Sequence, residues 1–216
     1  MPDDQRPDAH MIATHDRLRA VYKTPADAAV KKVLPALDRH CRAFIEQSPF
    51  CVLATADTDG NLDASPKGGP PGFVRVSAAS TVMLPDWPGN NRLDGLENII
   101  VNPRVGLLFF LPGMTEMLRL NGRARVSADP ALKPQFETDG HLPMSVIVVT
   151  IEQVYLHCSR ALQRSALWDS GRQIDRKTAF PTMGQMLADQ IKGYDGDGVD
   201  RLIAANAGNL YGGAKP

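Results

Sequence analysis

The segment MLRLNGRARVS, residues 117–127, alternates regularly between two kinds of side chain. One parity carries small or apolar residues: Leu118, Leu120, Gly122, Ala124 and Val126. The other parity carries polar or cationic residues: Arg119, Asn121, Arg123 and Arg125. Successive side chains of a strand point to opposite faces, so this period of two predicts an antiparallel strand with one apolar and one cationic face.

Other strand-like segments lie on both sides of this one, and most of their connections have turn composition. They cover residues 50–56, 62–66, 73–76, 81–85, 105–111 and 145–158. The run 105–111 is apolar on both faces, which places it deep in a sheet or between subunits. Short helices are expected at about 92–100 and about 130–137. Six or more strands without strand–helix–strand alternation predict an antiparallel barrel flanked by helices.

The two ends of the chain have helical patterns. Residues 7–48 carry apolar side chains at spacings of three and four, interrupted at Pro25 and Pro35, and helical patterns return from residue 181 onward. A length of 216 residues suits one medium domain with helical extensions.

Composition excludes several classes of protein. The 24 lysines and arginines balance the 24 aspartates and glutamates, so nothing indicates a polyanionic partner such as DNA. No apolar run approaches the length of a membrane span, and the polar N-terminus is unlike a signal peptide, so we expect a cytoplasmic protein. Cys41, Cys51 and Cys158 fit reduced thiols better than a disulfide framework. The five histidines and three cysteines lack metal-ligand spacing, so no metal site is expected.

Polar groups at the ends of the strands are the remaining candidates for a site, because the chain lacks the common nucleotide-binding, serine-hydrolase and zinc-protease motifs. No catalytic residue is therefore predicted. In SPKGG, residues 65–69, a serine and a lysine meet a glycine-rich turn. The alternatives there are a ligand close to the backbone and a plain turn with a solvated lysine.

The segment PGNNRLD, residues 88–94, has two interpretations. Asn90 or Asn91 can cap a helix that starts near Arg92, with Asp94 completing a variant of the capping box. This cap does not explain Arg92, because a cation in the first turn opposes the helix dipole. A phosphate held by the helix N-terminus, an asparagine amide and Arg92 would explain it.

The segment HCSRALQRSALWD, residues 157–169, places Arg160 and Arg164 four residues apart, with Trp168 close by. The arginines and the indole could hold an anionic or aromatic ligand. An amphipathic helix anchored by Trp168, with solvated arginines, explains the pattern equally well.

Taken together, these segments resemble the pyridoxamine 5'-phosphate oxidase-like, FMN-binding split-barrel superfamily, and in particular its PPOX-class branch of FMN-dependent enzymes. The matching pieces are FCVLATADTDGNLDASPKGGPPGFV, TVMLPDWPGNNRLDGLENIIVNPRVGLLFFLPG, LRLNGRARVS and VYLHCSRALQRSALW, within residues 44–168. The resemblance implies a six-stranded antiparallel split β-barrel, of mainly β class with flanking helices, which forms a homodimer with two FMN sites at the subunit interface. The substrate would be a small molecule, with neither nucleic acid nor membrane as a partner.

The resemblance also implies a set of cofactor-binding residues. Ser65 and Lys67 match contacts to the flavin ring and phosphate, and the backbone of Pro85 and Asp86 matches a segment beside the ring. Asn91 and Arg92 match the positions that hold the phosphate. Glu116 and Met117 match the point where the second subunit reaches the flavin.

Four more residues are candidates for the substrate side or the rim of the pocket: His157, Arg160, Arg164 and Trp168. For His157, a buried structural role is the alternative. The C-terminal substrate pattern of the true oxidases has no match here, which argues against vitamin B6 oxidation. The expected function is therefore an FMN-dependent oxidoreductase acting on an unidentified small molecule. The alternatives are a non-catalytic protein that stores or senses flavin, and the same fold with deazaflavin F420 or haem.

The expected organisation has three parts: an N-terminal helical extension over residues 1–48, a split-barrel flavin-binding domain over 49–170, and a C-terminal helical tail over 171–216 that packs on the barrel.

Overall fold

The computed structural model describes residues 10–212, and within them the side chains of all residues except Lys177. The chain divides into two compact units, Met1–Val33 and Leu34–Pro216. The first contains helices α1 (His15–Val21) and α2 (Asp27–Lys31), all of whose side chains are exposed. Residues 7–9 of the expected helical region and 213–216 of the expected tail lie outside the described residues. The boundaries near residues 48 and 170 stay predictions.

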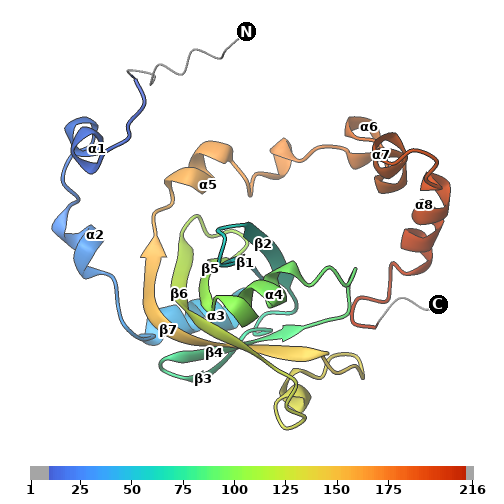
Figure 1. Ribbon diagram of the computed structural model, residues 1–216, viewed down its shortest axis with the longest axis horizontal. Helices are drawn as coiled ribbons and strands as arrows, with labels where there is room; N and C mark the ends of the chain where they lie inside the picture. The colour runs from blue at the N-terminus through green and yellow to red at the C-terminus, as the bar shows by residue number, and fades with distance from the viewer. Residues whose placement is uncertain (1–9, 213–216) are drawn as a thin grey trace. The chain divides into compact units, whose positions relative to one another are not determined.

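The second unit is built on one antiparallel sheet (Figure 1). Its strands are β1 (Phe50–Ala56), β2 (Leu62–Gly68), β3 (Arg75–Ala78), β4 (Thr81–Asp86), β5 (Arg104–Phe110), β6 (Met117–Ser127) and β7 (Ser145–His157). Their order is β2-β1-β5-β6-β7-β4-β3. The expected antiparallel sheet with flanking helices is confirmed. The sheet has seven strands rather than six, and no ladder joins its outer strands β2 and β3 within the described residues.

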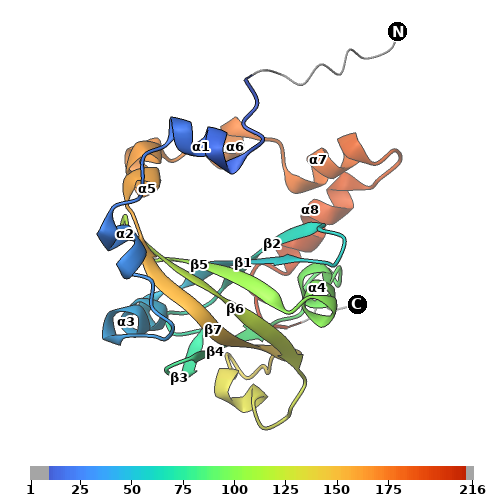
Figure 2. The same cartoon turned by 60° about the vertical axis from the view of Figure 1, so that its left-hand side comes forward.

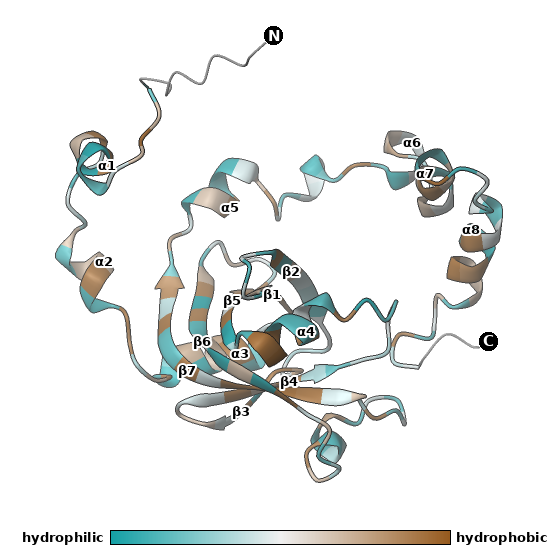
Figure 3. Ribbon diagram, viewed as in Figure 1, coloured by the Kyte–Doolittle hydropathy of each residue, from teal (hydrophilic) through white to brown (hydrophobic). Residues whose placement is uncertain are grey.

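The two longest strands, β6 and β7, pair along their length and curve through the centre of the sheet (Figures 1 and 2). Leu118, Leu120 and Ala124 are buried on one face of β6, whereas Arg123 and Arg125 are exposed on the other, as the alternation predicts. Figure 3 shows this alternation as hydrophilic and hydrophobic bands along β6 and β7. A bulge shifts the register beside Gly122, where a Cβ would collide with the carbonyl oxygen of Thr150. Only a residue without a side chain fits that close approach.

Two helices pack on the sheet and complete the core. Helix α3 (Arg39–Gln47) contacts β3, β6 and β7, and α4 (Asp94–Val101) contacts β1, β2 and β6. Apolar side chains from the helices, such as Ile45 and Ile99, join buried strand residues such as Leu53, Leu107 and Leu120 in one cluster. The expected helix at 130–137 is instead a short 3-10 turn, η1 (Lys133–Phe136), which covers a smaller cluster around Val146.

The C-terminal segment contains α5 (Arg160–Ser165), the 3-10 turn η2 (Ser170–Arg172), α6 (Arg176–Ala179), α7 (Met183–Gln190) and α8 (Gly196–Ala205). Helices α7 and α8 pack closely, because Gly184 and Gly196 meet backbone to backbone. Asp200 fixes this contact by accepting hydrogen bonds from the Thr182 hydroxyl and from the Gly184 N–H. No helix within residues 10–212 is long and apolar enough to cross a membrane.

Candidate functional site

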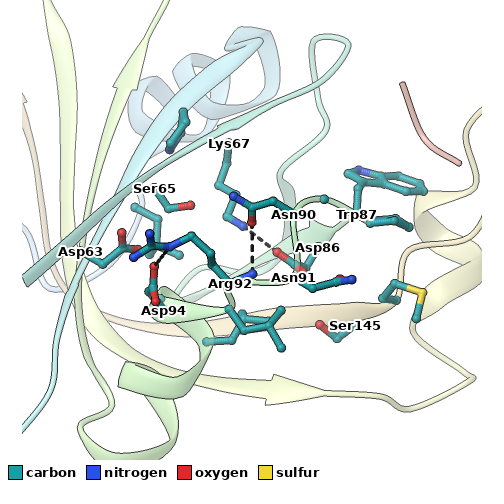
Figure 4. Close-up of a pocket in the computed structure, with 18 of the residues that line it drawn as sticks. Asp63, Ser65, Lys67, Asp86, Trp87, Asn90, Asn91, Arg92, Asp94 and Ser145 are labelled. Atoms are coloured by element: carbon teal, nitrogen blue, oxygen red, sulfur yellow. Dashed lines mark hydrogen bonds and ion pairs between the residues drawn. The ribbon is translucent and has the colours of Figure 1, made fainter. Parts of the chain in front are cut away.

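A cavity of about 770 Å³ lies at the open side of the sheet, between β2 and the end of β4. Asp63, Ser65 and Lys67 reach it from β2, because residues two apart on a strand share a face. The loop after β4 and the first turn of α4 form its other wall, and Val126, Met144 and Ser145 add to the lining. Figure 4 shows the labelled side chains from β2, from the loop after β4 and from the start of β7 around one hollow.

An ion pair joins the two strands that border the cavity. The ammonium group of Lys67 on β2 lies 2.6 Å from Oδ1 of Asp86 on β4. The two side chains are only 19% and 13% exposed, so the contact is shielded from bulk water. Among the described residues, no strand ladder links β2 to β4, so this ion pair joins two strands that backbone hydrogen bonds leave unconnected.

The loop between β4 and α4 has an unusual backbone. Asn91 and Leu93 have φ angles of 57° and 61°, in the left-handed region that favours glycine. Asparagine tolerates this region, but for leucine the conformation is strained by about 1–2 kcal/mol. Such strain is retained where surrounding structure or function requires it. Between these two residues, the backbone N–H of Arg92 donates to Oδ1 of Asn90 at 3.1 Å.

The start of helix α4 differs from the sequence prediction. The helix begins at Asp94, and its N-cap is Leu93, which makes no side-chain cap. Neither Asn90 nor Asn91 caps it, because the two left-handed residues turn the chain before the helix begins. Arg92 therefore precedes the helix instead of occupying its first turn. Its Nε donates to Oδ2 of Asp94 at 2.7 Å.

This corner offers several donors to an anion. The Arg92 side chain is 74% exposed, and Asp94 engages only its Nε, which leaves the terminal guanidinium N–H groups available. The backbone N–H groups of Asp94 and Gly95 have no acceptor among the described residues. Asp94 raises the pKa of Arg92 through its hydrogen bond and charge, and Asp63 adds a smaller electrostatic effect in the same direction. An oriented guanidinium beside free helix N–H groups fits a phosphate.

The opposite side of the cavity contains an unpaired polar atom. The hydroxyl oxygen of Ser145 is buried and has no hydrogen-bond partner, the one such side-chain atom among the described residues. Ser145 opens β7 and lies directly across from Asp86 on β4. Figure 4 shows it on the side of the cavity that carries Trp87, away from Asp63 and Arg92. Buried polar groups without partners are rare, so this one fits a site that a ligand completes.

The structure brings only part of the expected site together. Five of the predicted residues line the cavity: Ser65, Lys67, Asp86, Asn91 and Arg92. Pro85 instead faces a second cavity of about 370 Å³, because neighbouring residues of β4 point to opposite faces. Trp87 lines both cavities, and its ring meets that of Tyr211 edge-on, with the ring centroids 4.8 Å apart.

The other predicted residues gather at the far end of the long strands. Met117 is buried at the start of β6 and lies opposite His157, while Glu116 is exposed. Arg160 and Arg164 are exposed on α5, and the indole N–H of Trp168 donates to the carbonyl oxygen of Met114 at 2.7 Å. The helix anchored by Trp168, one of the two interpretations of this segment, is thus present.

None of this second group lines the cavity of its own chain. On β6, the lining residue Val126 and Met117 lie nine positions apart, near opposite ends of the strand. The expected contact of Glu116 and Met117 with the cofactor, from a second subunit, stays a prediction.

Among the cavity residues that sequence reasoning missed are three with polar or polarisable side chains: Asp63, Met144 and Ser145. Asp63 shares the parity of Ser65 and Lys67, so the period of two along β2 could have identified it. Met144 and Ser145 required the pairing of β4 with β7. These strands are distant in the sequence, and their register comes from the fold.

Several solved structures are similar to this chain at low identity. HupZ of Group A Streptococcus is 17% identical, with a TM-score of 0.46 over 56% of this chain and 93% of that one. A protein from Clostridium acetobutylicum, related to general stress protein 26 and described as pyridoxinephosphate oxidase family, is 15% identical, with a TM-score of 0.41 over 53% and 82% of the two chains.

An FMN-binding protein from Syntrophomonas wolfei is 12% identical, with a TM-score of 0.41 over 56% of this chain and 88% of that one. These likenesses are too distant to identify a ligand here. No curated protein matches the chain in sequence. The family profile described as pyridoxamine 5'-phosphate oxidase matches residues 37–158, more than half of the chain and the whole of the seven-stranded sheet. The chain therefore belongs to the pyridoxamine 5'-phosphate oxidase family.

Proposed function

We propose that this protein is an FMN-dependent oxidoreductase that acts on a small molecule as a homodimer, with the cofactor bound between the subunits. The observation that carries the proposal is the corner around Arg92. Two non-glycine residues in the left-handed region hold a largely exposed guanidinium beside free helix N–H groups. A surface arginine needs no such backbone, and strained backbone of this kind clusters at functional sites, of which a phosphate site at a helix N-terminus is one.

The phosphate belongs at this corner for reasons of charge. Lys67 and Asp86 already neutralise each other, whereas Arg92 keeps donors that Asp94 does not use. We therefore assign the phosphate to Asn91, Arg92 and the N–H groups that open α4. Ser65, Lys67 and Asp86 then lie along the ring of the cofactor.

The proposed cofactor accounts for the chemistry that the protein lacks. FMN, when bound, supplies the transfer of hydride or electrons, so the protein needs no nucleophile of its own. The protein itself binds the phosphate, orients the ring and limits the access of water to it. A cavity of about 770 Å³ is within the size range of cofactor sites.

The homodimer is supported by the face of the sheet opposite the core. Val52, Leu108 and Phe110 are half-buried there, and the rings of Phe50 and Phe110 lie 5.9 Å apart. An apolar face bordered by Arg119 suits an isologous contact, in which each copy presents the same patch. Such a contact would also offer Met117 and His157 of one copy to the site of the other.

Replacing Arg92 tests the assignment of the phosphate. We expect Arg92→Ala to weaken FMN binding about tenfold or more, because it removes charge-assisted hydrogen bonds, and to change riboflavin binding little, because riboflavin has no phosphate. Fluorescence titration of the ligand-free protein measures both affinities. Arg201→Ala is the matched control, since Arg201 is 72% exposed and also pairs with an aspartate. Equal losses for FMN and riboflavin would contradict the assignment.

Two further measurements separate this proposal from its rivals. A flavin-storage or flavin-sensing protein would bind FMN but would oxidise NAD(P)H no faster than free FMN does. A protein that carries F420 or haem would show the absorption spectrum and released mass of that cofactor. Turnover above the free-FMN background supports the oxidoreductase.

A further inference from the structure

Three polar groups, on β2, β4 and β7, form a row on the wall of the cavity. Lys67 lies 2.6 Å from Oδ1 of Asp86, and Asp86 lies directly across the β4–β7 ladder from Ser145. Directly opposed residues on one face have Cβ atoms about 4.5–5.5 Å apart. The order along the row is therefore ammonium, carboxylate, hydroxyl.

Each member of the row keeps capacity for a hydrogen bond with a ligand. The ammonium group of Lys67 has three N–H donors and directs one bond to Asp86. The second carboxylate oxygen of Asp86 accepts no hydrogen bond within the described residues. The hydroxyl of Ser145 has no partner, and a rotation about its χ1 angle can redirect it.

We propose that Lys67, Asp86 and Ser145 form a donor–acceptor–donor row that recognises an imide edge, the sequence C=O, N–H, C=O along one side of a pyrimidine-type ring. This inference rests on the proposed flavin site and deepens it. A flavin has such an edge at its N3 position, as does a 5-deazaflavin, whereas haem has none. Lys67 and Ser145 donate to the two carbonyl oxygens, and Asp86 accepts the N–H between them.

The arrangement of the cavity agrees with this orientation. Arg92 and Asp94 lie on the side of Asp63, and Ser145 lies on the opposite side, so phosphate and ring edge occupy separate ends (Figure 4). An FMN molecule has the same separation, because its ribityl chain joins the ring to the phosphate. The same orientation explains why the hydroxyl of Ser145 has no partner among the described residues. If the ligand supplies the hydrogen-bond acceptor for this hydroxyl, the hydroxyl is unsatisfied while the cavity is empty.

The test compares FMN with 3-methyl-FMN, in which a methyl group replaces the imide hydrogen. Wild-type protein, freed of ligand, is titrated with both compounds by fluorescence. We expect FMN to bind at least about tenfold more tightly, because the methyl group leaves the second carboxylate oxygen of Asp86 without a donor. In Asp86→Ala this ratio falls to about one. Asp59→Asn, in an exposed turn, is the control and keeps the wild-type ratio.

Ser145→Ala gives a second, independent signature. We expect both compounds to bind about five- to tenfold more weakly, while the melting temperature of the ligand-free protein stays unchanged or rises. The rise follows because alanine removes a buried hydroxyl that has no partner. A purely structural serine would lower the melting temperature instead. Ser80→Ala, at an exposed serine, is the control for both readouts.

The possible outcomes separate this inference from the proposed function. Equal affinities of the wild type for FMN and 3-methyl-FMN, or an unchanged affinity in Ser145→Ala, would overturn the imide row and leave the flavin site standing. Absence of FMN binding by the wild type, together with absence of F420 binding, would overturn both. Tighter binding of F420 than of FMN, with the same effects of Asp86→Ala and Ser145→Ala, would support the row and change the cofactor.

Discussion

The contact between Lys67 and Asp86 changes the role that the sequence alone indicated for the lysine. From SPKGG, Lys67 could be a solvated side chain or a contact to an anion. The structure pairs it with Asp86 and leaves it 19% exposed, so its charge is balanced within the protein rather than by solvent. The sequence could identify both residues, but their pairing depends on how β2 and β4 are placed in space.

The three thiols differ in their surroundings, and this gives a prediction at the scale of single residues. Burial raises the pKa of Cys51 to about 12, and burial together with its contact to Asp38 raises the pKa of Cys41 to about 12, whereas Cys158 is exposed. Because the thiolate is the reactive form, we expect a thiol reagent at pH 8 to label Cys158 in the native protein and all three cysteines after unfolding. If the native Cys158→Ser protein were labelled as fast as the native wild type, Cys41 or Cys51 would have to be reactive, which would contradict this prediction.

Among the elements, the strands could be predicted best. Segment 117–127 coincides with β6, and 50–56 with β1, because period-two alternation and apolar runs report directly on burial. The start of α4 could not be predicted. Asn91 and Asp94 look like a capping box, but the left-handed conformation of Leu93 has no signal in the sequence, since leucine rarely adopts it.

The start of α3 gives a prediction at the scale of an element. Oδ1 of Asp38 accepts the Cys41 backbone N–H at 2.7 Å and caps the helix, and this hydrogen bond lowers the pKa of Asp38. We expect Asp38→Ala to reduce the free energy of unfolding by about 1 kcal/mol, as measured by urea denaturation. Asp16→Ala, in the exposed first turn of α1, should leave that transition unchanged.

The pH dependence of this cap follows from the sign of the shift. A carboxyl group whose pKa is lower in the folded state than in the unfolded state stabilises the protein at every pH above its pKa in the unfolded state. This stabilisation is lost as the pH falls through its pKa in the folded state. The difference in stability between wild type and Asp38→Ala should therefore shrink in acid. A difference that grew as the pH fell would show that Asp38 does not act as an ionised cap.

At the scale of the whole molecule, the predicted site residues fall into two groups, one that lines the cavity and one near the start of β6 and the end of β7 that does not. A sequence cannot show this separation, because it depends on the length and direction of a strand within the sheet. The proposed homodimer would bring the two groups into one site. The outer face that carries Val52, Leu108 and Phe110 is the surface we assign to that contact.

A charge on that face tests the homodimer. We expect Leu108→Glu to shift the protein from dimer to monomer in light scattering after size exclusion, because burying an unpaired carboxylate between apolar faces is unfavourable. FMN affinity should fall with the loss of the dimer. Leu202→Glu, at an apolar residue of α8 that is 52% exposed, is the control and should stay dimeric. A Leu108→Glu protein that remains dimeric would place the interface elsewhere.

The central claim, that the cavity holds FMN by its phosphate, is tested most directly by titrating the ligand-free protein with FMN and with riboflavin. The account predicts saturation at one FMN per chain and an affinity for riboflavin that is at least about tenfold weaker, because riboflavin cannot engage the corner around Arg92. Absence of saturable FMN binding, or equal affinities for the two flavins, would contradict it.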